Sequence, residues 1–115
     1  MESIQFRKPE TVDEAVKLLQ GADGDARILA GGTDLLVQLR AHMIDPGVIV
    51  DIKSIAETRE LTKNDDGSYT IGAAVAGAEA HERDDITADW PGVIEAWDLI
   101  GSTQIQGRAS LGGNL

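Results

Sequence analysis

Two glycine pairs provide the residues whose types and spacing could do chemistry. Glycine lacks a Cβ and adopts a positive φ readily, so a ligand can approach the backbone of a glycine loop closely. Backbone N–H groups in such a loop, together with a hydroxyl, suit an anion and most often a phosphate. The predicted binding residues are Ala30, Gly31, Gly32, Thr33 and Asp34 in a first loop, and Ser110, Leu111, Gly112, Gly113 and Asn114 in a second loop.

The first glycine pair lies between a predicted strand and a predicted helix. Arg27-Ile28-Leu29 is a short apolar run typical of a buried strand, and the residues after the loop have the spacing of a helix face. Thr33 is the predicted N-cap of that helix. A plain strand-to-helix turn explains a single loop of this kind, since short glycine motifs have many false positives. Two such loops in one small domain favour a site that grips both halves of a pyrophosphate.

The elements that position the first loop follow a β-α-β-α-β order. Thr11 and Glu14 form a predicted capping box at the start of the first helix, and Gly21 fits the C′ position at its end. The second helix is predicted to run to about Met43. Short links between alternating strands and helices imply parallel pairing and right-handed crossovers. The predicted strands are 4–7, 27–30 and 48–52, and the predicted helices are 12–20 and 35–43.

The second half of the chain has a different pattern. Asp66-Gly67 predicts the turn of an antiparallel hairpin between 59–63 and 69–73. A short helix is predicted from Gly77 to about residue 83, and another from Pro91. The second of these should bury one face and place Trp97 in the core; that face is Val93, Ala96, Trp97 and Ile100. The acids around these helices are interpreted as solvated surface: Glu79, Glu82, Asp84, Asp85 and Asp89.

Composition and charge limit the possible functions. The 115-residue chain has a net charge of −10 and no cysteine, which excludes disulfides, thiolate metal sites and iron–sulfur ligation within it. His42 and His81 are isolated, so no metal site is predicted. The acidic charge argues against nucleic-acid binding. A cytoplasmic protein without a membrane span is predicted, because no apolar run approaches ~20 residues and the N-terminus lacks signal-peptide features.

The chain resembles the N-terminal part of the FAD-binding (medium) subunit of molybdenum hydroxylases. That family includes carbon monoxide dehydrogenase and xanthine dehydrogenase. The resemblance covers nearly the whole chain, and the two glycine motifs in this order and at this separation are its most specific part. The stretches that carry it are Phe6 to Pro9, Ala30 to Leu36, Val50-Asp51-Ile52, Ile71-Gly72-Ala73 and Ser110 to Leu115.

The resemblance implies an α/β fold with a split FAD site of the vanillyl-alcohol-oxidase type. A first FAD-binding α/β subdomain would span 1–54, and 55–115 would begin a second, α+β subdomain. The two loops would hold the pyrophosphate of FAD, with Gly72-Ala73 near the cofactor. Family subunits continue well beyond the second glycine motif, so the fold is expected to be incomplete and the isolated chain to bind FAD weakly or not at all.

The resemblance also implies a function in electron transfer. The subunit would relay electrons from the iron–sulfur clusters of a small subunit to a terminal acceptor, while a molybdenum-cofactor large subunit oxidises the substrate. No residue of this chain is predicted to be catalytic, and the isolated chain is expected to be inactive as an oxidoreductase. Two alternatives stay open: a flavin-free structural or assembly module, and a generic phosphate-binding α/β domain.

Two positions depart from the family pattern. Many relatives have Arg-Asn where this chain has Gln106-Gly107, and often Thr where it has Val75. The first difference removes a positive charge near the second loop.

Overall fold

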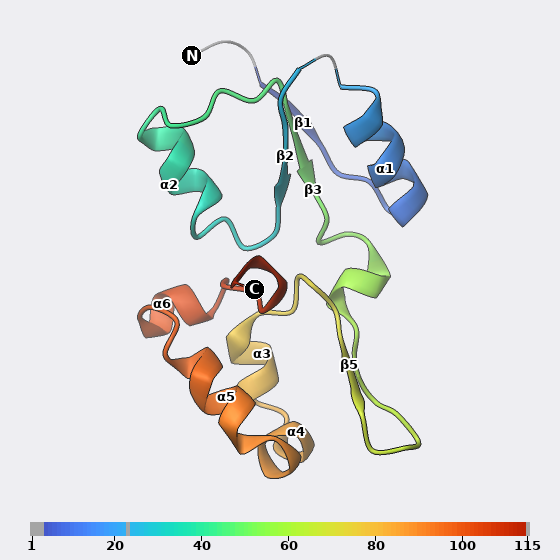
Figure 1. Ribbon diagram of the computed structural model, residues 1–115, viewed down its shortest axis with the longest axis vertical. Coiled ribbons are helices and arrows are strands. Elements are labelled where there is room, and N and C mark those ends of the chain that lie inside the picture. Colours follow the sequence, from blue (N-terminus) through green and yellow to red (C-terminus); the bar gives the residue numbers. More distant parts are fainter. Residues whose placement is uncertain (1–3, 23, 115) are drawn as a thin grey trace.

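The structure is a computed structural model that describes residues 4–22 and 24–114. The molecule measures 47 × 31 × 17 Å, and its radius of gyration of 15.6 Å exceeds the roughly 13 Å expected for a compact domain of this length. Figure 1 shows the reason: two groups of elements follow one another along the long axis. The segment that carries the second glycine pair returns to lie between the two groups.

The first group contains a parallel sheet of three strands. Its order is β1-β3-β2, with β1 at Gln5–Arg7, β3 at Val48–Asp51 and β2 at Ala26–Leu29. The central strand pairs with both neighbours, so that Ile49 lies opposite Phe6 and Arg27. The predicted parallel β-α-β-α-β arrangement is confirmed. Among the three strands of this sheet, only the central strand β3 has buried residues, which are Ile49, Val50 and Asp51.

The prediction that 27–29 form a buried strand is wrong. β2 is an edge strand, and the side chain of Ile28 is 51% exposed. An apolar run of four residues has the same appearance in a central strand and in an edge strand. The order of the strands decides which strand is buried, and in this sheet β3, its last strand in the sequence, lies at the centre.

Helix α1 (Val12–Gln20) packs on one face of the sheet and α2 (Leu35–Arg40) lies on the other (Figure 1). Opposite faces follow when two crossovers of the same hand move in opposite directions across a sheet. The first core forms under α1, where Ala15 packs with Val50 and Ile55.

Helix α1 has the predicted bounds, and its two caps differ from the prediction in detail. The Glu14 N–H donates to Thr11 Oγ1 over 3.1 Å, as a capping box requires. The Glu14 carboxylate, however, accepts from the N–H of Glu10 rather than from that of Thr11. Gly21 is the C-cap itself, with a right-handed φ of −84°, rather than the predicted C′ residue.

Helix α2 is shorter than predicted and begins differently. Its N-cap is Asp34, not Thr33, and it ends at Arg40 rather than near Met43. His42 adopts a left-handed φ of 55°, its N–H donates to Leu39 O, and the Met43 N–H donates to Gln38 O. This is the bonding pattern of a Schellman motif, with histidine in the place that glycine usually fills. The motif stops the helix although the apolar spacing continues.

The second group combines a hairpin with short helices. The β4–β5 hairpin is antiparallel, and Gly67 takes the expected positive φ of 86° in its turn. The elements are the 3₁₀ helix η1 (Ala56–Arg59), strands β4 (Leu61–Lys63) and β5 (Tyr69–Ile71), helices α3 (Gly77–His81), α4 (Asp84–Asp89), α5 (Pro91–Asp98) and α6 (Thr103–Gln106), and the 3₁₀ helix η2 (Gly112–Asn114). Within the described residues, none of the helices has the length and apolarity that a membrane crossing requires.

The acids interpreted as solvated surface are exposed or half-exposed, as predicted, but some of them also have ionic partners. Residues 84–89 form α4, which buries Ile86 in the core. The carboxylate of Asp85 pairs with Arg83 over 2.7 Å. Asp89 Oδ2 accepts from Lys63 Nζ over 2.8 Å and from the Tyr69 hydroxyl over 2.6 Å, which ties α4 to the hairpin. These hydrogen bonds lower the pKa of the Asp89 carboxyl.

Trp97 is the largest side chain of the second core, as predicted. It is 1% exposed, and its Nε1 donates to the Ala109 carbonyl over 3.3 Å. The rest of the predicted face is partly wrong, because Ile94 is buried in place of Val93. Gly77 packs against the ring, where an added Cβ would lie 2.8 Å from ring atoms.

The two tryptophans allow a matched test of this core. We expect Trp97→Ala to lower the free energy of unfolding by about 3–5 kcal/mol, because it removes a large side chain from a closed core. Trp90, which is 52% exposed, serves as the control. Trp90→Ala should cost about 1–1.5 kcal/mol. Urea denaturation followed by far-UV circular dichroism measures both, and equal losses would contradict this description of the core.

Candidate functional site

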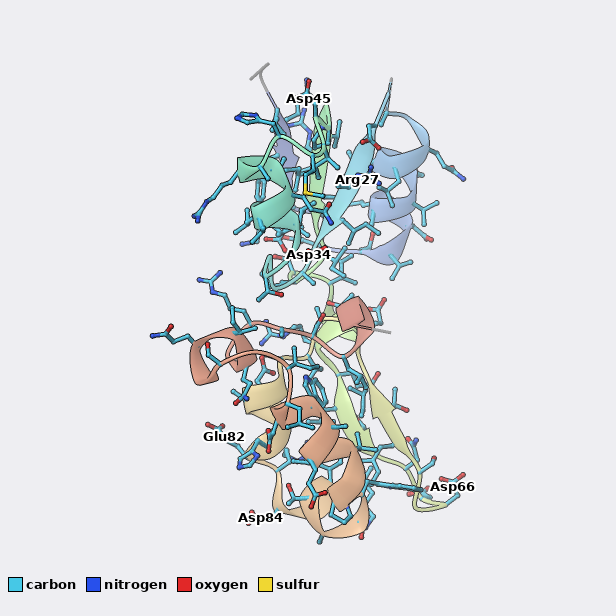
Figure 2. All side chains as sticks on the ribbon, turned by 60° about the vertical axis from the view of Figure 1, so that its left-hand side comes forward. Arg27, Asp34, Asp45, Asp66, Glu82 and Asp84 are labelled. Atoms are coloured by element: carbon cyan, nitrogen blue, oxygen red, sulfur yellow. The ribbon has the colours of Figure 1, made fainter. Side chains whose placement is uncertain are left out.

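A cavity of about 430 Å³ lies where the first group of elements meets the second. Figure 2 shows Asp34 at the end of the first group that faces the second. Eight of the ten predicted binding residues line this cavity, five from the first loop and three from the second. They are Ala30, Gly31, Gly32, Thr33, Asp34, Ser110, Gly112 and Gly113. Leu111 is not in the lining, and the side chain of Asn114 lies outside the described part of the chain.

Five further residues complete the lining, and four of them were missed by the sequence analysis. They are Ile28, Leu35, Gln38, Ile52 and Ala73, of which Ala73 alone was expected, from the family resemblance. Ile52 follows the carboxyl end of β3, at the edge of the sheet where the first loop begins. Ligands of open α/β sheets bind outside the carboxyl ends of the strands. That rule, applied to the predicted third strand, would have found Ile52.

The two loops meet in a contact between backbones. A Cβ built on Gly31 would lie 1.9 Å from the carbonyl oxygen of Arg108, a distance that no side chain tolerates. A Cβ on Gly112 would lie 2.7 Å from the carbonyl oxygen of Ala73. From the sequence, these glycines are predicted to allow close approach by a ligand. In the structure, Gly31 and Gly112 are required by close approach of the protein to itself.

The other glycine of each pair shapes its own loop. Gly32 has a φ of 81°, and a Cβ there would meet Leu36 Cδ1 at 3.0 Å. In the second loop the Gly113 N–H donates to Ser110 Oγ over 3.1 Å. Ser110 is buried and forms an isolated antiparallel bridge with Ala76. The second loop is therefore fixed to the body of the second group.

An ion pair behind the first loop also escaped the sequence analysis. Lys53 Nζ lies 2.9 Å from Asp51 Oδ1 and donates to the Ala30 carbonyl over 2.6 Å. The Lys53 N–H donates to the same carboxylate oxygen over 2.9 Å. Burial alone would raise the pKa of Asp51, but these hydrogen bonds and the charge of Lys53 outweigh it and lower the pKa. The pair connects the end of β3 to the start of the loop.

The electrostatic character of the cavity comes from backbone groups and one carboxylate. Asp34 is the one ionisable side chain among the described lining residues, and its Oδ2 accepts from Gln38 Nε2 over 2.6 Å. Within the described chain, the N–H groups of residues 31 to 34 have no hydrogen-bond partner. Because residues 31 to 34 line the cavity, these N–H groups are candidate donors to an anion there. Helix α2 has only six residues and adds little dipole.

The described residues form no cluster of side chains that could bind a metal ion. No group of three or more histidine, cysteine, aspartate or glutamate side chains gathers within 4–22 and 24–114. His81 Nδ1 lies 3.0 Å from Asp98 Oδ2 in the second group, and neither residue lines the cavity.

Comparison with known proteins identifies the family. The family described as "FAD binding domain in molybdopterin dehydrogenase" matches residues 2–115. The chain belongs to this family. It is 37% identical over 111 residues to the xanthine dehydrogenase FAD-binding subunit of Escherichia coli O157:H7, covering 96% of this chain and 37% of that subunit. It is 31% identical over 112 residues to the carbon monoxide dehydrogenase medium chain of Hydrogenophaga pseudoflava, covering 97% of this chain and 39% of that chain.

Solved structures of the family have the same mixed α/β fold. The Hydrogenophaga pseudoflava carbon monoxide dehydrogenase that lacks the Mo-pyranopterin moiety superposes with a TM-score of 0.90 at 32% identity, over 98% of this chain and 39% of that chain. Quinoline 2-oxidoreductase from Pseudomonas putida 86 gives a TM-score of 0.88 at 26% identity, over 97% of this chain and 39% of that chain. This chain thus spans less than two fifths of the length of these family members.

The two departures from the family pattern lie outside the cavity lining. Gln106 Nε2 donates to the carbonyl of Asp98, so it fastens the end of α5. Val75 is fully buried in the second core, where a methyl group replaces the hydroxyl that Thr would have to satisfy. Neither residue lines the cavity.

The backbone contact at Gly31 can be tested with a one-carbon change. We expect Gly31→Ala to lower the free energy of unfolding by about 1–3 kcal/mol, because the new Cβ meets a carbonyl that cannot move freely. Gly92→Ala is the matched control, since a Cβ there meets nothing within 4 Å and lies in α5. Alanine should stabilise that helix by up to about 1 kcal/mol. Chemical denaturation measures both changes, and a neutral Gly31→Ala would contradict the close contact.

The Asp51–Lys53 pair predicts a pH dependence of stability. The pKa of Asp51 is lowered in the folded chain, so its contribution is full above the unfolded-state pKa of about 3.9 and disappears as the pH falls through the folded-state value. We therefore expect Asp51→Asn to be less stable than the wild type at pH 7 and the difference to shrink below about pH 4. Urea midpoints across this pH range measure it. A difference that is constant with pH would mean that the charge of Asp51 is not what stabilises the fold.

Proposed function

We propose that this chain is the FAD-binding module of a molybdenum hydroxylase and that it holds the diphosphate of FAD between its two glycine loops. The observation that carries the proposal is the cavity lined from both sides by residues of the two loops. Membership of the FAD-binding family supports the choice of ligand. The ten loop residues named from the sequence, 30–34 and 110–114, are the proposed contacts.

The chemistry of the lining fits a diphosphate. The N–H groups of residues 31 to 34, which have no partner within the described residues, provide donors, and the hydroxyl of Thr33 provides another. The carboxylate of Asp34 suits a sugar hydroxyl rather than a phosphate oxygen, because like charges repel. The apolar side chains of Ile28, Leu35 and Ile52 can pack against less polar parts of the cofactor.

The cavity has the size of a small-molecule site but is smaller than FAD needs. Its volume of about 430 Å³ lies near the lower end of the usual range for ligand pockets. It can enclose the diphosphate with adjoining atoms while both ring systems extend beyond it. This agrees with the expectation that the isolated chain binds FAD weakly.

We also propose the finer description of the fold. The two hydrophobic clusters, one around Val50 and one around Trp97, support a first FAD-binding α/β subdomain at 1–54 and the start of an α+β subdomain at 55–115, as in the vanillyl-alcohol-oxidase type. Ile55 still packs with the first cluster, so the boundary is a short segment rather than a single bond.

The function of the whole subunit is proposed from the family. FAD, when bound, would supply redox chemistry that passes electrons from the iron–sulfur clusters of a small subunit to a terminal acceptor. A large subunit with the molybdenum cofactor would oxidise the substrate, and the complex would lie in the cytoplasm. The role of this chain is to bind and orient the cofactor, and none of its residues is proposed as catalytic.

One observation favours a second candidate, a structural module without flavin. Gly31 and Gly112 are needed for contacts within the protein, so the glycine pairs by themselves do not require a ligand. A generic phosphate-binding domain is the third possibility. The three candidates differ in ligand preference, which makes a titration decisive.

Titration of the purified chain tests the proposal. We expect FAD to bind with a dissociation constant weaker than about 1 μM, because much of the cofactor stays in water. ADP, which shares the diphosphate, should compete with FAD, and riboflavin should not. Flavin fluorescence and calorimetry measure both. Absence of binding at millimolar FAD would favour the structural module, and equal affinity for inorganic diphosphate and FAD would favour the generic domain.

A hydroxyl in the cavity provides a finer test. Thr33→Ala should weaken FAD binding by about 5- to 30-fold, the effect of one hydrogen bond to a charged group. Thr62→Ala in the hairpin is the matched control, because its hydroxyl bonds Glu60 on the surface and does not line the cavity. The control should bind FAD like the wild type. Equal affinities of the two variants would remove Thr33 from the site.

A further inference from the structure

Lys53 is hydrogen-bonded to the first residue of the first loop and belongs to neither hydrophobic core. Its ammonium group donates to the carbonyl of Ala30 over 2.6 Å and to Asp51 Oδ1 over 2.9 Å. The Asp51 side chain is 7% exposed, so the ammonium is anchored to a buried carboxylate at the end of the central strand. Lys53 itself does not line the cavity. The bond to Ala30 therefore reaches the loop from outside the cavity.

The geometry of the peptide unit turns this bond into a directional constraint. The described chain contains no cis peptide bond, and in a trans peptide the C=O and the following N–H point in opposite directions. Fixing the Ala30 oxygen on the side of Lys53 thus directs the Gly31 N–H away from Lys53. That N–H has no partner within the described residues, and both Ala30 and Gly31 line the cavity.

The loop needs such a constraint because glycine follows the peptide. Rotation of the Ala30–Gly31 peptide requires compensating changes in ψ of Ala30 and φ of Gly31, and glycine tolerates changes of φ that other residues do not. The contact of Gly31 with the Arg108 carbonyl limits where its Cα lies, but it does not set which way the preceding peptide faces. The hydrogen bond from the Lys53 ammonium to the Ala30 carbonyl fixes the orientation of this peptide.

We propose that Lys53 is a positioning residue, which holds the Ala30 carbonyl so that the Gly31 N–H faces the cavity and donates to the diphosphate of FAD. The proposal rests on the proposed function of the cavity for its second half, the donation to FAD. Its first half concerns the orientation of a peptide in the chain itself. Asp51 acts through Lys53, because its carboxylate keeps the ammonium from turning toward solvent.

Binding measurements test the part that involves the ligand. Lys53→Met removes the donor and keeps the length of the side chain, and it should weaken FAD binding at least 10-fold. Lys53→Arg retains a donor and a charge and should recover a part of the affinity. Lys63→Met is the control, because it removes a surface ion pair with Asp89 on the hairpin and leaves the loop untouched. Its affinity for FAD should equal that of the wild type.

Nuclear magnetic resonance of the ligand-free chain tests the peptide itself. With ¹⁵N-glycine labelling, the Gly31 amide should give one resonance in the wild type and a shifted or exchange-broadened one in Lys53→Met, with Lys53→Arg close to the wild type. If Lys53→Met unfolds because Asp51 is left unpaired, the Asp51→Asn/Lys53→Met double variant removes both charges and provides the same measurement.

The outcomes separate this inference from the proposed function. A wild type that fails to bind FAD, with a Gly31 amide that still responds to Lys53→Met, would overturn the FAD site and leave the positioning role supported. A wild type that binds FAD, with a Gly31 amide unchanged in Lys53→Met and in the double variant, would overturn the positioning role. A fall in the affinity of Lys53→Met would not rescue that role, since the fall would then come from the lost charge alone.

Discussion

The contact between Gly31 and the carbonyl of Arg108 is the constraint on which the site depends. Each group of elements has its own hydrophobic core, one around Val50 and the other around Trp97. Those cores stabilise the groups separately, but they do not determine the space between them. That space is set where the backbone of the first loop touches the backbone that leads into the second loop. A cavity lined from both sides exists because no Cβ keeps the loops apart.

The general organisation of the chain follows from its sequence, because it depends on local signals. Alternating apolar runs and capping residues indicated the β-α-β-α-β order, and Asp66-Gly67 indicated the hairpin turn. Eight of the ten predicted binding residues line one cavity, and their role in binding a cofactor stays a prediction. The reason given for the glycines was incomplete. A glycine can make room for a ligand or for another part of the protein. The sequence does not distinguish these two cases, because the contacts of Gly31 and Gly112 are with residues that are distant in the chain.

The errors have the same origin in non-local contacts. The exposure of β2 depends on strand order, and the partners of Asp89 in α4 lie on the hairpin, with Lys63 more than twenty residues earlier in the chain. Lys53 and Ala30 are likewise separated by 23 positions, so their hydrogen bond has no periodic signal. The early end of α2 is a different case, because it depends on a histidine in a left-handed conformation that propensity would assign to glycine or asparagine.

The exposed edge strand β2 lies beside the cavity. β2 leaves one row of backbone groups unpaired, and such an edge is a template for pairing with a strand of another molecule. Ile28 belongs both to this edge and to the wall of the cavity. A ligand in the cavity would therefore lie beside a strand whose outer edge is open to pairing.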